Sequence, residues 1–281
     1  MAITEKRIDV GEVHLNVAMQ GEGKPVLLLH GFPEFWYSWR HQMDALAKAG
    51  FCAIAPDLRG YNKSDKPREV SAYRLDRIEQ DIVGLLRALG HERAHVVGHD
   101  WGGALSWTFA SRQSQHVDKL VVMNCPPPER MARAFLTPRQ LMKSWYMFFF
   151  QLPFLPERAT RDPHFMVRAF RGMAVNKARF SDADIARFEE AFAQPGAATG
   201  ALNWYRAAFR YPKLNLKLPA IERPTMLIWG ERDTALGIEL LEGLDRYARN
   251  LRIERIPNAS HWVQQDAPDE VNALLVPFLK D

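Results

Sequence analysis

An aspartate stands where the sequence places a reactive side chain on a tight turn. In the stretch VVGHDWGGAL, residues 96–105, Asp100 has one glycine two positions before it and another two positions after it. A strand-like apolar run precedes the turn and a helical pattern follows, so the central residue needs a strained backbone between small neighbours. The positive end of the following helix favours an ionised carboxylate. The motif predicts a carboxylate nucleophile, and a capping Asp on a glycine-rich turn is its alternative.

Two further residues stand where a hydrolase needs the partners of its nucleophile. Asp233 follows a strand-like run, and His261 lies in the loop after the next predicted strand. The chain order nucleophile, acid, histidine is one that hydrolase triads take. We expect Asp233 to orient the ring of His261, which in its neutral form would activate a water as base.

The stretch HGFPE, residues 30–34, follows the first buried strand-like run. Its bend would direct the backbone N–H of Phe32 into the same space as the N–H of Trp101. Two such donors form an oxyanion hole. An ordinary turn built on Gly and Pro is the alternative for this stretch.

Alternating strands and helices must position these groups. The first twenty residues alternate apolar and polar and reach GEGKP, which predicts a hairpin turn. Continuous apolar runs predict buried strands, and 3.6-residue patterns predict helices. Strands are expected at 25–31, 51–60, 94–100, 119–128, 225–233 and 251–256, and helices at 40–49, 75–89, 102–112, 236–248 and 268–279.

This alternation predicts an α/β fold with a mostly parallel sheet and helices on both faces. It is interrupted from about residue 129 to 217, where Arg, Phe and Met are frequent and no strand is expected. We interpret residues 1–128 and 218–281 as the core and residues 129–217 as a helical cap. The cap would cover the carboxyl ends of the strands, where ligands bind in such sheets.

The composition is that of an ordinary globular protein. The chain has 281 residues, of which 47% are hydrophobic and 25% charged, with a formal net charge of only +4. The basic residues are scattered, which argues against nucleic-acid binding. No apolar run is long enough to span a membrane, and the N-terminus lacks the apolar stretch of a signal peptide. Cys52 and Cys125 are expected to be free thiols in a reducing compartment, so we expect a cytoplasmic location.

Taken together, the motifs resemble those of the epoxide hydrolases with the α/β-hydrolase fold. The resemblance covers nearly the whole chain. It rests on HGFPEFWYSWR, DLRGYNKSDKP, VVGHDWGG, the Asp after WGER and the His before WVQQDAP. It implies an α/β-hydrolase core with an inserted cap, a catalytic triad of Asp100, Asp233 and His261, and a reaction without a cofactor.

The resemblance also implies two tyrosines in the cap that assist ring opening. LNWYR is similar to the family segment that bears one of them, which maps to Tyr205, and SWYMFFFQLP maps the other to Tyr146. Ligand pockets are mostly apolar, so we expect aromatic side chains to line this one. The residues expected to bind substrate are Trp36, Trp204 and Phe149, with Trp39 and Trp101 as further lining candidates.

Haloalkane and fluoroacetate dehalogenases share the Asp nucleophile and resemble this chain less. The haloalkane type typically has Asn at the position of Phe32, and the fluoroacetate type has Arg at the position of Trp101. One departure from the epoxide hydrolase pattern is Asn62, where Gly is usual. Asn tolerates a left-handed backbone, so we expect little consequence.

The sequence therefore predicts an epoxide hydrolase that forms vicinal diols through an ester on Asp100. A haloalkane or haloacid dehalogenase and a non-catalytic ligand-binding protein on the same scaffold are the alternatives. We expect a small apolar epoxide as partner, no nucleic acid and no membrane, and we leave a homodimer open. HERAH, residues 91–95, matches a zinc-protease pattern that requires a helix, whereas a strand is expected here, so we expect no metal site.

Overall fold

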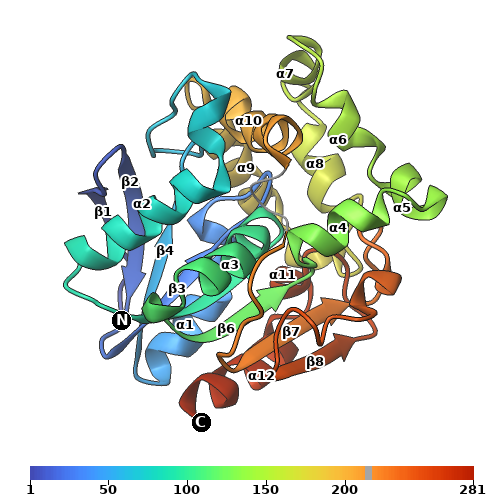
Figure 1. Ribbon diagram of the computed structural model, residues 1–281. Coiled ribbons are helices and arrows are strands. Elements are labelled where there is room, and N and C mark those ends of the chain that lie inside the picture. Colours follow the sequence, from blue (N-terminus) through green and yellow to red (C-terminus); the bar gives the residue numbers. More distant parts are fainter. Residues whose placement is uncertain (213–216) are drawn as a thin grey trace.

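The computed structural model describes residues 1–212 and 217–281 (Figure 1). The strands are β1 (Thr4–Asp9), β2 (His14–Gln20), β3 (Lys24–Leu29), β4 (Phe51–Pro56), β5 (Ala94–His99), β6 (Val117–Met123), β7 (Thr225–Gly230) and β8 (Leu251–Ile256). The helices of the core are α1 (Arg40–Lys48), α2 (Leu75–Ala88), α3 (Trp101–Arg112), α11 (Val263–Asp266) and α12 (Pro268–Lys280). Between β6 and β7 lie α4 (Pro128–Ala134), α5 (Pro138–Lys143), α6 (Trp145–Phe149), α7 (Leu155–Ala159), α8 (Phe165–Phe170), α9 (Asp182–Phe192) and α10 (Ala197–Arg210). Short 3-10 helices are η1 (Trp36–Trp39), η2 (Val70–Tyr73), η3 (Ser114–His116), η4 (Lys177–Arg179) and η6 (Ile238–Leu241).

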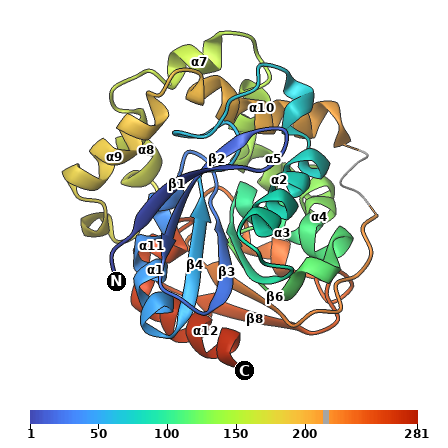
Figure 2. The same ribbon diagram turned by 90° about the vertical axis from the view of Figure 1, so that its left-hand side faces the viewer.

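The strands form one sheet in the order β1-β2-β4-β3-β5-β6-β7-β8. The β1–β2 and β2–β4 pairs are antiparallel, and the other pairs are parallel. Figure 2 shows α2 and α3 on one face of the sheet and α1 and α11 on the other. Both faces are thus covered, which is why β5 and β7 are buried throughout. The α/β-hydrolase fold expected from the sequence is confirmed.

Helix α2 illustrates how the sequence produces such an element. Its buried residues include Leu75, Ile78, Ile82 and Leu85, whose spacing of three or four places them on one face. Gly90 follows the helix with a φ of +75°, a left-handed conformation in which glycine commonly ends a helix.

The carboxyl ends of the parallel strands bring the predicted site residues together. Phe32 follows β3, Asp100 follows β5, Asp233 follows β7, and His261 lies in the loop after β8. The order of strands reverses between β3 and β5, and such a switch point is where open α/β sheets bind ligands.

The predicted hairpin at GEGKP is wrong. These residues join β2 to β3, but β4 lies between the two strands in the sheet. The first hairpin pairs β1 with β2 instead, and in its turn the N–H of Val10 donates to the carbonyl of Val13 at 3.0 Å. A local turn signal predicts a chain reversal, but it does not determine which strands pair.

The helix predicted at 236–248 is also wrong, since only the short η6 forms there. Gly237 has an extended backbone and Gly243 has a left-handed φ of +67°, so a continuous helix is interrupted twice. Leu240 and Leu244 are buried nevertheless. Their helix-like spacing therefore reflects the packing of an irregular segment.

The segment between β6 and β7 is helical from α4 to α10, as expected of a cap (Figure 1). The assigned cap boundaries at 129 and 217 stay a prediction, and residues 213–216 lie outside the described residues. None of the described helices is long and apolar enough to cross a membrane.

Candidate active site

Asp100 lies on a strained turn between β5 and α3. Its φ of 50° and ψ of −119° are unusual for a residue with a side chain. A Cβ atom at Gly102 would lie 2.0 Å from the carbonyl oxygen of Leu29, and one at Gly98 would lie 2.2 Å from the Oγ of Ser106. Only glycine fits at either position. The two glycines of the motif therefore permit the turn that exposes the Asp100 carboxylate to a cavity.

The structure brings the three predicted triad residues together. The Nδ1 of His261 lies 2.7 Å from the Oδ2 of Asp233, and its Nε2 lies 3.5 Å from the Oδ2 of Asp100. All three side chains are largely buried. One imidazole ring therefore bridges two carboxylates.

The proton of His261 is held by these two carboxylates. Burial alone would lower the pKa of His261, but the charge of Asp233 and hydrogen bonds to Asp100 and Asp233 raise it to about 10. Burial would likewise raise the pKa of both carboxyls, yet their interactions with His261 hold the pKa of each below its usual range. At neutral pH an imidazolium thus lies between two carboxylates. The sequence expects neutral His261 as the base that activates water, which is a different state from this one, and that role stays a prediction.

The predicted oxyanion-hole donors lie beside the nucleophile. The backbone N–H of Phe32 donates to the Oδ1 of Asp100 at 2.8 Å. Trp101 opens helix α3, and the first amides of a helix have no partner within the helix. The role of both amides in stabilising an oxyanion stays a prediction.

The two predicted tyrosines reach the same cavity as Asp100. Tyr146 comes from α6 and Tyr205 from α10, and their ring centroids are 6.1 Å apart. The cavity has a volume of about 370 Å³, and Asp100 lines it together with both tyrosines. Burial, followed by the nearby charge of Asp100, raises the pKa of each phenol well above its usual range.

The side chains expected to bind substrate lie elsewhere, with one exception. Trp101 lines the cavity, but Trp36, Trp39, Trp204 and Phe149 are not among its lining residues. Trp204 is buried and donates from Nε1 to the carbonyl of Arg59, and Phe149 packs against Trp145 and Phe150. Trp204 thus links the cap to the core and Phe149 packs within the cap, and periodicity alone could not separate these roles from pocket lining. The apolar walls come instead from residues the sequence did not single out: Leu75, Met131, Phe135, Met147 and Phe209.

Sequence reasoning also missed the groups that hold the triad. Asn124 follows β6 and donates from Nδ2 to the Oδ2 of Asp233 at 2.8 Å. The amides of Ala235 and Leu236 donate to the other oxygen of Asp233 at 2.7 and 2.8 Å. An Asn at a strand end carries no signal by itself, because its partner is distant in sequence.

A second buried pair of a histidine and a carboxylate, His99 and Glu34, contacts the backbone of His261. His99 contacts the Oε2 of Glu34 through Nδ1 at 2.8 Å and the carbonyl of His261 through Nε2 at 2.8 Å. Gln264 and Gln265 donate to the other oxygen of Glu34. This network fixes the backbone of the loop that carries the catalytic-site histidine.

The stretch HERAH does not form a helix. His95 lies within β5 and His91 lies before it, so the two rings do not share a helix face. Among the described residues, no group of three or more His, Cys, Asp or Glu side chains could hold a metal ion.

Comparison with known proteins places this site in a family. A family model described as alpha/beta hydrolase fold matches residues 24–268. AB hydrolase superfamily protein YfhM of Bacillus subtilis (strain 168) is 41% identical over 273 residues, which cover 96% of this chain and 94% of that protein. Epoxide hydrolase 4 of Homo sapiens is 40% identical over 274 residues, which cover 94% of this chain and 75% of that protein. The chain belongs to the epoxide hydrolases of the α/β-hydrolase family.

Solved structures of epoxide hydrolases have the same fold as this family member. The Bacillus megaterium epoxide hydrolase in complex with an inhibitor has a TM-score of 0.89 and 32% sequence identity, covering 99% of this chain and 100% of that one. Epoxide hydrolase A from Mycobacterium thermoresistibile also has a TM-score of 0.89 and 32% identity, covering 99% of this chain and 98% of that one. The similarity to these solved structures therefore extends over nearly the whole chain.

We predict that Asp100→Asn lowers the pKa of His261 by roughly one unit or more, because it removes one of the two carboxylates that hold the proton. NMR titration of the ring nitrogens measures this pKa. Asp182→Asn, at a side chain that is 97% exposed, is the control and should leave the pKa unchanged. An unaltered pKa in Asp100→Asn would contradict the charge arrangement described here.

Proposed function

We propose that this protein hydrolyses epoxides to vicinal diols through an alkyl ester on Asp100. The observation that carries the proposal is that Asp100, Tyr146 and Tyr205 line one largely apolar cavity. A carboxylate nucleophile and two phenolic donors thus face a space of about 370 Å³, which suits a small apolar epoxide.

Ring opening needs a nucleophile at carbon and an acid at oxygen. The Oδ2 of Asp100 attacks one oxirane carbon, the carbon–oxygen bond breaks, and its electron pair moves to the oxygen. Tyr146 and Tyr205 donate hydrogen bonds to that oxygen, and one of them transfers its proton. Their raised pKa keeps both phenols protonated at neutral pH. An alkoxide is a stronger base than a phenolate, so the transfer remains favourable.

Ester formation also prepares the second step. The Asp100 ester is neutral, so His261 loses one of the two charges that raise its pKa. The ring can then release its proton. Solvent carries this proton to the tyrosinate left by ring opening, which becomes a phenol again. Neutral His261, still held by Asp233, takes a proton from the water that attacks the ester carbonyl.

The backbone supports the hydrolysis. The N–H of Phe32 already lies 2.8 Å from the Oδ1 of Asp100, the oxygen that becomes the ester carbonyl. With the N–H of Trp101 it would stabilise the tetrahedral oxyanion. Collapse of that intermediate breaks its bond to the alkoxide oxygen, which takes the hydroxyl proton of the intermediate and leaves as the diol. Asp100 is again a carboxylate, and His261 keeps the first water proton as an imidazolium.

This chemistry explains why the turn carries an aspartate. A serine that attacked a saturated carbon would leave a stable ether, whereas an aspartate leaves an ester that water can hydrolyse. A dehalogenase would need no phenols, because halide leaves without protonation. The presence of Tyr146 and Tyr205 in the cavity therefore favours an epoxide hydrolase over a dehalogenase. A non-catalytic binding protein would not need the complete triad. Three points remain expectations from the sequence: a cytoplasmic location, no nucleic-acid partner, and a homodimer left open.

We predict that the protein converts styrene oxide or another aryl epoxide to its diol and releases no halide from haloalkanes or haloacids. In His261→Gln the base is missing, so the ester should accumulate and increase the intact mass by that of the epoxide. Asp100→Ala, which cannot form the ester, is the control. Normal turnover by His261→Gln, or halide release without diol, would refute the assignment.

We predict that Tyr205→Phe and Tyr146→Phe each lower kcat/KM for an aryl epoxide by about a hundredfold, because each removes one donor to the oxygen while keeping the ring. Steady-state diol formation measures the loss. Tyr61→Phe is a matched control, because the hydroxyl of Tyr61 is buried without a hydrogen-bond partner in the described part of the chain. Retention of full activity when both cap tyrosines are changed would count against the proposal.

A further inference from the structure

Large apolar side chains gather on the outer surface of the cap. Eight of the twelve exposed large hydrophobic residues in the described chain lie within residues 136–155. Leu136 is 87% exposed, Phe154 84%, Met142 71% and Trp145 64%. We call the exposed apolar side chains of residues 136–155 the cap patch. A monomeric protein rarely exposes such a cluster unless it binds something.

The cap patch extends over three short helices. In Figure 1, α5, α6 and α7 follow one another along the outer edge of the cap. The aromatic run of α6 is divided between two sides: Tyr146 lines the cavity, whereas Trp145 and Phe148 are exposed. Part of this aromatic run therefore belongs to the outer surface of the cap.

The surrounding charge favours one kind of partner. Residues 130–179 contain ten Lys or Arg and only two Asp or Glu, although the whole chain has a net charge of just +4. Arg158 and Arg161 are exposed, and neither has an ion-pair partner in the described part of the chain. Apolar side chains flanked by basic ones are typical of segments that lie on an anionic membrane surface. A second copy of the same basic face would be repelled.

The cap patch is also continuous with the wall of the active-site cavity. The exposed Phe148 packs edge-on against Phe209 at 5.2 Å and against Phe135 at 5.9 Å between ring centroids. Both Phe209 and Phe135 line the cavity. An apolar path therefore leads from the outer surface of the cap to the space above Asp100.

We propose that the cap patch docks this protein onto a lipid bilayer that contains anionic headgroups. The apolar side chains of α5, α6 and α7 enter the interface, and the basic side chains contact the headgroups. This proposal differs from the expectation, drawn from the sequence, of no membrane partner. Docking stands independently of the catalytic proposal; if the protein hydrolyses epoxides, docking also brings the cavity close to apolar substrates dissolved in the bilayer.

The test is flotation of the full-length protein with vesicles, without any epoxide. We expect the protein to bind vesicles of equimolar phosphatidylglycerol and phosphatidylcholine, to bind pure phosphatidylcholine much less, and to dissociate at high salt. The combined variant Met142→Gln, Trp145→Gln and Phe154→Asn keeps the net charge and should lower the partition coefficient by about tenfold or more. Ile253→Gln, at an exposed apolar residue on β8, is the matched control and should leave binding unchanged.

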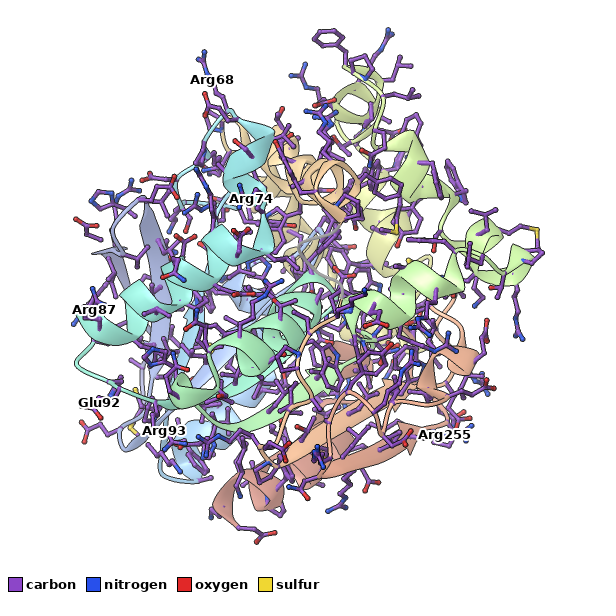
Figure 3. The ribbon with its side chains drawn as sticks, viewed as in Figure 1. Arg68, Arg74, Arg87, Glu92, Arg93 and Arg255 are labelled. Atoms are coloured by element: carbon purple, nitrogen blue, oxygen red, sulfur yellow. The ribbon has the colours of Figure 1, made fainter. Side chains whose placement is uncertain are left out.

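Charge is tested separately. Arg139→Gln, Arg158→Gln and Arg161→Gln together should lower binding to the anionic vesicles by about tenfold or more. Arg87→Gln is the control, and Figure 3 shows Arg87 at the side of the molecule opposite α5. Circular dichroism and the Tm confirm that each variant is folded. If the combined apolar variant does not fold, the combined arginine variant tests docking by itself.

Three results would overturn the proposal. One is failure of the wild-type protein to bind the anionic vesicles at low salt. Another is equal binding by the wild type and both combined variants. The third is a wild-type protein that does not bind vesicles but forms a dimer without lipid, seen by light scattering, while the apolar variant is monomeric. That last result would assign the cap patch to a second copy of the chain.

Discussion

A buried carboxylate that must stay charged is the constraint on which the rest of the site depends. Burial of Asp100 favours its neutral form, and the neighbouring imidazolium of His261 and the amide of Phe32 help to keep it ionised. The imidazolium in turn requires Asp233, which is held by Asn124 and two backbone amides. These groups follow β3, β5, β6, β7 and β8, so the parallel sheet is needed to assemble them at one edge.

The same balance of charge links the two halves of the proposed reaction. While Asp100 is a carboxylate, it keeps the proton on His261 and preserves its own reactivity. Once Asp100 is esterified, its negative charge no longer holds the proton on His261. The ring can then act as the base for hydrolysis of the ester. The cap has two sides with different roles in this account. Its inner side supplies Tyr146 and Tyr205 to the cavity, and its outer side presents the cap patch.

The sequence predicted the parts that depend on local pattern. Continuous apolar runs located β3, β5, β6 and β7, and the glycine spacing around Asp100 located the turn. The sequence did not predict what depends on residues distant in the chain: β4 lies between β2 and β3 in the sheet, and Asn124 holds Asp233. Aromatic side chains were the hardest to place, because Trp204, buried between cap and core, and Phe135 at the cavity satisfy the same apolar pattern.

The covalent role of Asp100 is tested most directly by a single turnover in H₂¹⁸O with the protein in excess over a styrene oxide substrate. If water attacks the ester carbonyl, the first diol carries no ¹⁸O and one heavy oxygen appears in the peptide that contains Asp100. Mass spectrometry of the diol and of that peptide measures both. A first-turnover diol that carries ¹⁸O, with an unlabelled peptide, would show that water attacks the epoxide directly and would contradict the account.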